Sequence, residues 1–196
     1  MLSTVRQQRI GYAALVSDEE IIARVLSGSA QAYGELVARH QGNAYWLAYR
    51  MTGSREEAED AAQEAFVKAY VKLDAYRGTG SFWPWLRRIL LNTCLSKASR
   101  KGAKEPMVEL TEADCDSDYS LETEILNRAE AEEVRKAIAE LPATYRAAVV
   151  LRYREGLSYK ETAEQLGESL SNVRVRLYRA KRLLAVRLRG LSDELP

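Results

Sequence analysis

The chain of 196 residues is poor in the side chains that most often build catalytic and metal sites. It has one histidine, His40, and two cysteines, Cys94 and Cys115, which show no repeated spacing. This set provides neither a disulfide framework nor a zinc site. His40 falls on an apolar helical stripe, so we expect it to be structural. The sequence therefore predicts no catalytic residue, no metal and no cofactor.

Long apolar runs are also missing. The first residues, MLSTVRQQRIGYAALVS, contain arginines that interrupt every hydrophobic stretch. Neither a secretion signal nor a membrane span fits this pattern. We therefore expect a soluble, cytoplasmic protein with no membrane insertion.

Acidic side chains are absent from two long windows, residues 75–104 and 169–192, although the whole chain has 29 basic and 28 acidic residues. Each window carries seven Lys or Arg, whereas residues 105–133 between them hold 11 acids and one base. Positive charge follows a phosphate backbone. Two basic blocks separated by an acidic one therefore indicate a nucleic-acid partner.

Aromatic residues gather near the start of the first basic window: Tyr76, Phe82, Trp83 and Trp85. Flat rings can stack on unpaired bases, so this window is a candidate surface for single strands. Helical spacing, however, favours a core role for a stripe formed by Phe82, Trp85, Leu86 and Ile89. Trp83 lies off that stripe, and we expect it near a melted strand.

Hydrophobic periodicity and capping residues predict helices in the first half over residues 18–27, 29–51, 55–73 and 81–100. Ser17 and Ser54 are each followed by a glutamate three residues later, which predicts two capping boxes. Ser81 is a candidate N-cap for the basic helix. The intervening loop, residues 74–80, is rich in glycine, which lets a backbone approach a ligand closely.

The second half is predicted to be helical over residues 120–140, 142–155, 159–166 and 172–189. A short helix, a brief turn and a strongly basic helix form a helix-turn-helix, whose second helix enters the major groove. Ser158 and Glu161 predict a capping box at the start of the short helix, and Ser171 is the expected N-cap of the last helix. The acidic segment between the halves spans up to ~65 Å when extended. Two tethered domains could thus occupy separate sites on one duplex.

The predicted fold is all-α, with two small helical domains joined by an acidic flexible linker. The expected boundaries are an N-terminal extension at 1–17, a first domain at 18–101, the linker at 102–119, a second domain at 120–190 and a tail at 191–196.

Two stretches resemble one family, the extracytoplasmic-function sigma factors of bacterial RNA polymerase. Residues 60–70, DAAQEAFVKAY, are similar to the family's region two, together with Tyr76-Arg77-Gly78, Phe82, Trp85-Leu86, Ile89 and Asn92. Residues 156–163, GLSYKETA, are similar to region four, together with Leu141-Pro142, Leu166-Gly167, Val173-Arg174 and Arg179-Ala180. The two motifs occur in the family's order and cover most of residues 18–190.

The resemblance implies a non-enzymatic sigma factor that binds core RNA polymerase at its clamp helices and flap and directs promoter-specific initiation. It also implies promoter DNA and an anti-sigma factor as partners, nucleoid association through polymerase, and a linker that threads the polymerase. The implied polymerase-binding residues are Asp60, Gln63, Glu64 and Phe66. Those implied at the −10 element are Tyr76, Arg77, Gly78, Thr79, Trp83, Arg87, Arg88, Asn92, Lys97 and Arg100. Those implied at the −35 element are Ser171, Asn172, Arg174, Val175, Arg176, Tyr178, Arg179 and Arg182.

Some positions depart from the family pattern. The family commonly has Asp where Ser96 stands, Gly-Thr where Ser171-Asn172 stand, and a small polar residue where Val175 stands. The recognition helix is therefore expected to read an unusual promoter.

Two other functions remain open from the residues. A helix-turn-helix regulator that acts without polymerase explains residues 134–190 but leaves residues 60–66 unused. A nucleic-acid enzyme that holds a metal on Asp60 and Glu64 is disfavoured, because one carboxylate pair without other clustered ligands is more often surface charge.

Overall fold

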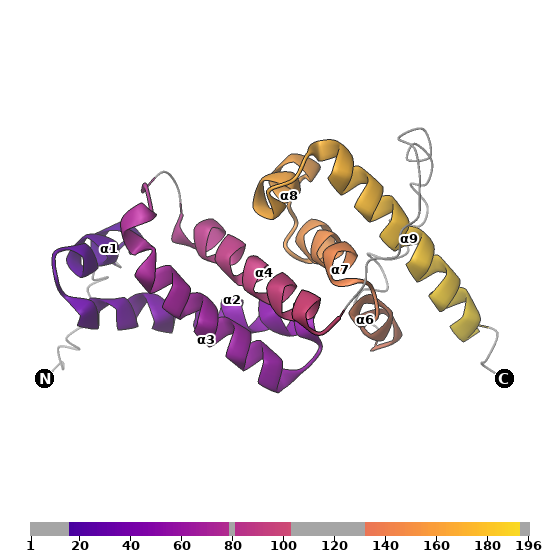
Figure 1. Ribbon diagram of the computed structural model, residues 1–196, viewed down its shortest axis with the longest axis horizontal. Helices are drawn as coiled ribbons and strands as arrows, with labels where there is room; N and C mark the ends of the chain where they lie inside the picture. The colour runs from indigo at the N-terminus through magenta and orange to yellow at the C-terminus, as the bar shows by residue number, and fades with distance from the viewer. Residues whose placement is uncertain (1–15, 79–80, 103–131, 193–196) are drawn as a thin grey trace, which may run out of the picture.

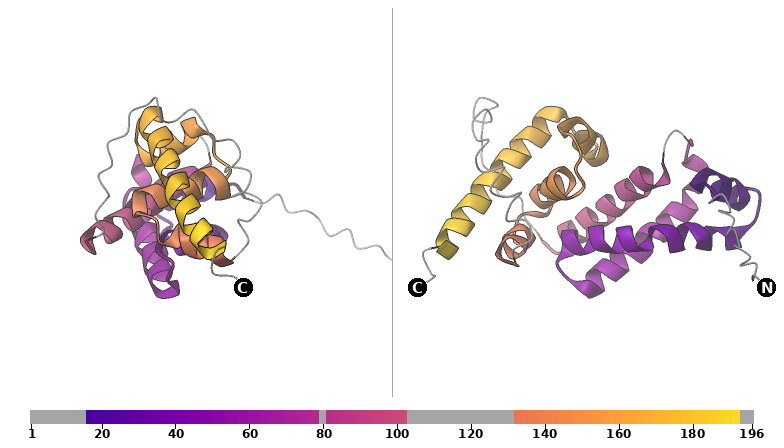
Figure 2. Two further views of the ribbon diagram at one scale, coloured as in Figure 1. Left: turned by 90° about the vertical axis from the view of Figure 1, so that its right-hand side faces the viewer. Right: turned by 180° about the vertical axis from the view of Figure 1, so that it is seen from behind.

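The computed structural model describes residues 16–78, 81–102 and 132–192, and these segments are helical, with no strand among them. They form two groups of helices that lie side by side, α1–α4 and α6–α9 (Figures 1 and 2). Buried residues of both groups belong to one continuous hydrophobic cluster. The all-α architecture is thus confirmed, while residues 103–119 of the predicted linker, residues 120–131 of the predicted helix and Cys115 lie outside the described ranges.

The first group follows the predicted pattern closely. Its helices are α1 (Asp18–Leu26), α2 (Tyr33–Thr52), α3 (Arg55–Val71) and α4 (Phe82–Arg100), with short 3-10 turns at Ala30–Ala32 and Leu73–Ala75. Ser17 and Glu20 form the predicted capping box, with both reciprocal hydrogen bonds present. Helical spacing places Leu26 on the apolar face of α1, but this last residue of the helix is 54% exposed.

Two predicted caps in this group are only partly correct. The Ser54 hydroxyl accepts a hydrogen bond from the Glu57 amide, but the Glu57 carboxylate does not return it. That carboxylate lies 2.7 Å from Lys101 Nζ, a charged partner at the end of α4 that replaces the backbone amide. Ser81 occupies the N-cap position of α4, yet its side chain makes no capping hydrogen bond.

Helix α3 packs closely on its neighbours because its inner face consists largely of alanine. The buried residues on it are Ala58, Ala61, Ala62, Ala65, Phe66 and Ala69. Small side chains let helix backbones approach, and α2 then contributes the Tyr33 hydroxyl, which donates to the Phe66 carbonyl at 2.7 Å. Burial raises the pKa of Tyr33, so this phenol stays protonated and remains a donor.

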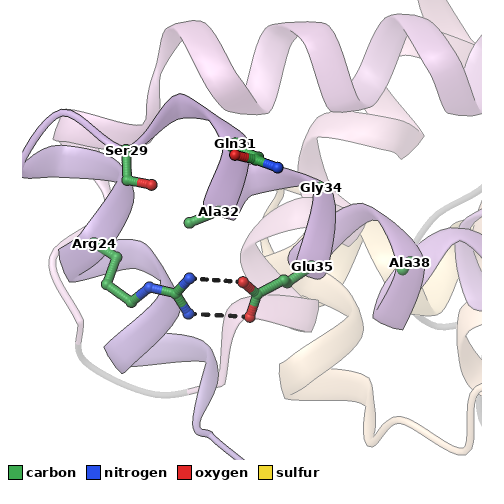
Figure 3. A pocket seen from close by; sticks show the side chains of 7 residues that line it. All are labelled: Arg24, Ser29, Gln31, Ala32, Gly34, Glu35 and Ala38. Atoms are coloured by element: carbon green, nitrogen blue, oxygen red, sulfur yellow. Dashed lines mark hydrogen bonds and ion pairs between the residues drawn. The ribbon is translucent and has the colours of Figure 1, made fainter.

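Helix α1 is fastened to α2 at both of its ends. At its C-terminal end, Arg24 makes two hydrogen bonds to Glu35, at 2.7 and 3.1 Å, across a surface hollow of about 470 Å³ (Figure 3). The hollow is otherwise lined by small or polar residues: Ser29, Gln31, Ala32, Gly34 and Ala38. At its N-terminal end, Asp18 contacts Arg39 and His40. Two polar contacts at opposite ends define how α1 lies on α2.

The second group contains the helix-turn-helix. Its elements are α6 (Glu132–Ala139), α7 (Ala143–Val149), a π-helical segment (Val150–Arg154), α8 (Tyr159–Leu166) and α9 (Leu170–Ser192). Ser158 and Glu161 form the predicted capping box at the start of α8. Gly167 ends α8 with φ +69°, a left-handed conformation that favours glycine.

The cap of α9 differs from the prediction. The helix begins at Leu170, one residue before Ser171, and the Ser169 hydroxyl accepts a hydrogen bond from the Asn172 amide at 3.1 Å. Ser169 is therefore the N-cap, and Ser171 lies inside the first turn. A serine stands at both positions, so local sequence did not distinguish them. The buried residues of α9 form one stripe and comprise Val173, Leu177, Ala180 and Leu184.

No helix within the described ranges combines the length and apolar character required to cross a membrane.

The hydrogen bond between α2 and α3 gives a test of this packing. Tyr33→Phe removes the buried hydroxyl and should lower the free energy of unfolding by about 1 kcal/mol, the usual net contribution of such a bond. Tyr70→Phe is the matched control, because Tyr70 packs edge-on against Tyr33 at 5.0 Å but is an exposed residue. Urea denaturation followed by circular dichroism measures both; equal losses in the two variants would contradict the role given to the Tyr33 hydroxyl.

Candidate polymerase and promoter-DNA interfaces

The candidate polymerase-binding residues lie on the exposed face of α3, with one exception. Asp60 is 71% exposed at its side chain, and Gln63 is also exposed. Phe66 is only 7% exposed and belongs to the core. Phe66, also predicted to contact polymerase, is thus buried in this structure, where its side chain belongs to the hydrophobic cluster.

Lysines from α3 and α4 partly neutralise this acidic face. Lys68 Nζ lies 2.7 Å and Lys97 Nζ 3.2 Å from Glu64, and Lys97 also lies 3.9 Å from Asp60. The hydrogen bond from Lys68, helped by Lys97, holds the pKa of the Glu64 carboxyl below its usual range. Lys97, predicted to contact DNA, is thus engaged with the acids of α3 in this structure.

The glycine-containing loop begins directly after the 3-10 turn. Arg77 and Gly78 are exposed, and Gly78 has φ +64° in open surroundings, where an added β-carbon would meet no atom within 4 Å. Side chains rarely tolerate this backbone conformation, so glycine is favoured here. Thr79, a candidate DNA contact, and Gly80 lie outside the described residues.

Aromatic rings stand on both sides of this loop. Tyr76 before it packs edge-on against Phe82 at 5.9 Å and Trp85 at 5.5 Å. Phe82 is fully buried, whereas Trp85 and Ile89 are half-buried. These three residues of the predicted stripe pack in the core, but the last two keep part of their surface exposed. Trp83, expected to lie off the core, is half-buried and packs against it. The loop therefore starts and ends on packed rings.

The basic residues of α4 point in different directions. Arg88, Asn92 and Arg100 are exposed and available to a phosphate backbone. Arg87, the neighbour of Arg88, is only 6% exposed. Arg87, predicted to contact DNA, is thus covered by α8 of the second group in this arrangement.

Arg87 is buried among partners from the second group. Its Nε donates to Gln165 Oε1 at 3.0 Å, and its Nη1 lies 3.8 Å from Glu155 Oε2. Burial lowers the pKa of Arg87, and the carboxylates of Glu155 and Glu161 act in the opposite direction. The other oxygen of Glu155 accepts from Arg50 Nη1 of α2 at 3.0 Å. Glu155 therefore joins two arginines of the first group to the second.

A third arginine, which belongs to the second group, also contributes to the contact between the two groups. Arg146 of α7 donates to the Met51 carbonyl at the end of α2, and also to the carbonyls of Ala139 and Leu141 within its own group. Cys94 of α4 is buried in the same part of the molecule, and this burial raises the pKa of its thiol to about 12. A thiol of that pKa is protonated near neutral pH and is a poor nucleophile.

The residues of α9 that were predicted to contact the −35 element differ in their exposure. Asn172, Arg174 and Arg182 are exposed. Arg176 instead pairs with Glu168 at 2.8 Å, and Arg179 contacts the Tyr145 hydroxyl at 3.4 Å, so both side chains are engaged within their own group. Ser171, Val175 and Tyr178 are half-buried. The turn before α9 lies against α4, since a β-carbon on Gly167 would come within 3.1 Å of Arg88 Nη2.

Sequence reasoning missed the residues that join the two groups: Arg50, Arg146, Glu155 and Gln165. No local signal marks them, because the Arg50–Glu155 pair is separated by 105 residues and the Arg87–Gln165 pair by 78. Across the described residues, no group of three or more His, Cys, Asp or Glu side chains is arranged to hold a metal ion.

Comparison with known families matches each helical group to a part of one protein family. A family model described as sigma-70 region 2 matches residues 36–104, and one described as sigma-70, region 4 matches residues 131–184. The RNA polymerase sigma-H factor of Pseudomonas aeruginosa is 33% identical over 186 residues, which cover 90% of this chain and 96% of that protein. The ECF RNA polymerase sigma-E factor of Escherichia coli K12 is 34% identical over 175 residues, covering 85% and 91%.

Solved structures also resemble the chain. CnrH, in complex with the cytosolic domain of CnrY, has a TM-score of 0.58 and 29% identity, and the match covers 88% of this chain and 97% of that one. The sigma factor RpoE from Bartonella quintana, in complex with the anti-sigma factor NepR, shares the fold with a TM-score of 0.58 at 21% identity, covering 80% and 96%.

The contact between the two groups predicts the effect of neutralising Glu155. Glu155→Gln removes the ion-pair partner of the buried Arg87, which should weaken the contact by about 1–2 kcal/mol; this is less than for a fully buried pair because Arg50 is 39% exposed. Glu164→Gln is the matched control, since Glu164 is exposed on the neighbouring α8. Small-angle X-ray scattering should show a larger radius of gyration for the first variant alone. Identical scattering from both variants would contradict the assigned role of Glu155.

Proposed function

This chain belongs to the extracytoplasmic-function sigma factors of bacterial RNA polymerase, and we propose how its two helical groups divide the work of promoter-specific initiation. A sigma factor binds core polymerase and directs it to promoters. The observation that carries the proposal is the occurrence of both family regions, in order, on the two groups. The region-two match sets aside a helix-turn-helix regulator that acts alone, because such a regulator has no use for α1–α4.

In this proposal, the first domain, residues 18–101, docks on polymerase through α3. Asp60 and Gln63 make the direct contacts, because they are the exposed polar side chains of the motif. Glu64 contributes a negative charge that its ion pairs with Lys68 and Lys97 partly neutralise. Phe66 contributes indirectly, because its buried side chain packs α3 against the rest of the domain. The docking face is therefore smaller than the sequence motif.

The same domain handles the −10 element with the loop after α3 and the start of α4. Gly78 allows close approach of a strand, Arg77 is an exposed cation in the same loop, and Arg88 is exposed on α4. Asn92 and Arg100 extend this polar surface along α4. We assign capture of the unpaired strand to the loop and phosphate contacts to the exposed residues of α4.

The second domain, residues 120–190, reads the −35 element with α9. Asn172 and Arg174 lie nearest the start of that helix, where a recognition helix contacts base edges. Arg182 lies two turns further on and is suited to a phosphate contact. Arg176 and Arg179 support this face through their contacts within the domain.

We further propose that the two domains separate when the protein works. The −35 and −10 elements are more than two turns of DNA apart, at about 10–10.5 base pairs per turn, whereas Arg88 adjoins the turn that precedes α9. Separation exposes Arg87 for a contact with DNA. An anti-sigma factor that binds both domains would oppose separation; the Bartonella quintana relative was solved with an anti-sigma factor, and CnrH with the cytosolic domain of CnrY.

The proposed docking face is tested by transcription with purified core polymerase. Wild-type protein plus core should give promoter-dependent transcripts from genomic DNA, and sequencing them identifies the promoter. The double variant Asp60→Ala and Gln63→Ala should bind core about tenfold more weakly, which corresponds to about 1.4 kcal/mol. Glu59→Ala, an exposed acid elsewhere on α3, is the control and should bind normally. Failure of the wild type to bind core would refute the function, and normal binding by the double variant would refute the docking face.

The division of labour along α9 gives a separate test on that promoter. Arg174→Ala should lose about 1–3 kcal/mol at one −35 position and relax its base preference. Arg182→Ala should weaken binding to all sequences similarly. It should also reduce the slope of log affinity against log salt concentration by about one. Binding titrations of holoenzyme on single-base variants at several salt concentrations distinguish the two; indistinguishable profiles would contradict the assignment.

A further inference from the structure

The histidine of this chain lies in a polar contact that fastens α1 beside the −10 loop. The capping box of Ser17 and Glu20 defines the start of α1 and thereby places Asp18 in its first turn. One oxygen of Asp18 lies 2.6 Å from Arg39 Nη1, and the other lies 2.8 Å from His40 Nε2. Arg39 also donates to the Val16 carbonyl at 2.8 Å. Asp18 thus connects the chain entering α1 to two successive residues of α2.

The imidazole of His40 in turn packs against the first two residues of α4. Its plane is parallel to the indole of Trp83 within 3°, with ring centroids 6.2 Å apart. It is tilted by 54° against Phe82, at 5.3 Å. A hydrogen bond on one edge of a ring restricts rotation of that ring, which an aliphatic residue at this position could not achieve. Asp18 therefore defines the orientation of the His40 ring, and this ring packs against Trp83 and Phe82.

These contacts continue to the other side of the loop. Phe82 packs edge-on against Tyr76, and both contact Trp85. Burial raises the pKa of Tyr76, and the negative charges of Glu19 and Asp18 add to that effect, which places the start of α1 beside Tyr76. Figure 1 shows α1 at the end of the first group where α3 ends and α4 begins. The loop thus starts and ends on rings supported by α1 and His40.

We propose that His40, held by Asp18, is a positioning residue for strand capture: it orients Trp83 and Phe82, and through them the loop that receives the unpaired −10 strand. This inference rests on the proposed function of that loop. His40 stacks on the indole of Trp83, and the half-buried indole keeps exposed surface for a base. His40 itself is buried and touches no DNA.

The test compares holoenzymes that carry sigma variants, using the promoter identified by transcript sequencing. The probe is a fluorescent single-stranded oligonucleotide with the non-template −10 sequence, and a scrambled oligonucleotide gives the reference affinity. His40→Phe keeps an aromatic ring but loses the bond to Asp18, and His40→Gln keeps a hydrogen-bonding group but loses the ring. Both should lower the ratio of the two affinities about fivefold or more, given the strength of base stacking. Asp18→Asn retains a hydrogen-bond acceptor and should keep most of the ratio.

Two controls separate positioning from loss of folding. Ile22→Val destabilises the buried face of α1 while keeping Asp18, His40 and all of the rings, and it should leave the ratio unchanged. Affinity for core polymerase should be the same in every variant, because α3 carries that contact. A wild-type ratio in both His40 variants, or an equal fall in Ile22→Val, would overturn the inference alone. No preference by the wild type would overturn the loop's proposed function and this inference with it.

Discussion

The guanidinium of Arg87 is withdrawn from water where α4 meets α8, and a charge in that position requires partners. Glu155 and Gln165 supply them, both from the second helical group. Glu155 directly follows the π-helical segment after α7 and lies close to Arg87. The same carboxylate also accepts a hydrogen bond from Arg50. Since leaving a buried charge unpaired costs more than an exposed pair contributes, these residues define how the groups meet.

Helix α4 is the element on which the other parts converge. Its aromatic N-terminal end supports the loop and contacts α2 through His40. Its middle faces the second group through Arg87, and its C-terminal end neutralises the acids of α3 through Lys97 and Lys101. The basic residues of this acid-free helix thus have three kinds of partner: the second helical group, the acids of α3 and, for the exposed residues, DNA. The exposed remainder is the part left for phosphate contacts.

The positions that depart from the family pattern differ in their surroundings. Ser96 is exposed on α4, so its replacement of an aspartate removes a surface charge rather than a packing group. Asn172 is exposed near the start of α9, where it can change base preference directly. Val175 is half-buried, so its effect on recognition depends on packing as well as on contact with DNA. An unusual promoter preference is thus expected to arise mainly at Asn172.

Local patterns in the sequence were sufficient for the helices and the two boxes at Ser17 and Ser158, because caps and apolar stripes depend on residues three to four positions apart. The family motifs likewise identified the protein's class. Local patterns misplaced the cap of α9, where Ser169 and Ser171 were equivalent candidates. They also gave no sign that Phe66 and Arg87 are buried within the chain, because a motif does not say which of its members are buried.

The contacts that only the tertiary structure decided join residues far apart in the chain. Arg50 and Glu155 are 105 residues apart, and the rings around the loop are oriented by Asp18 from the start of α1. Whether a basic residue faces solvent, a carboxylate or a neighbouring helix depends on which helices pack together. The sequence by itself thus determined the helices, the two capping boxes at Ser17 and Ser158, and the family. The folded chain decided which charged side chains remain free to bind, because burial and pairing of charges arise only when distant segments meet.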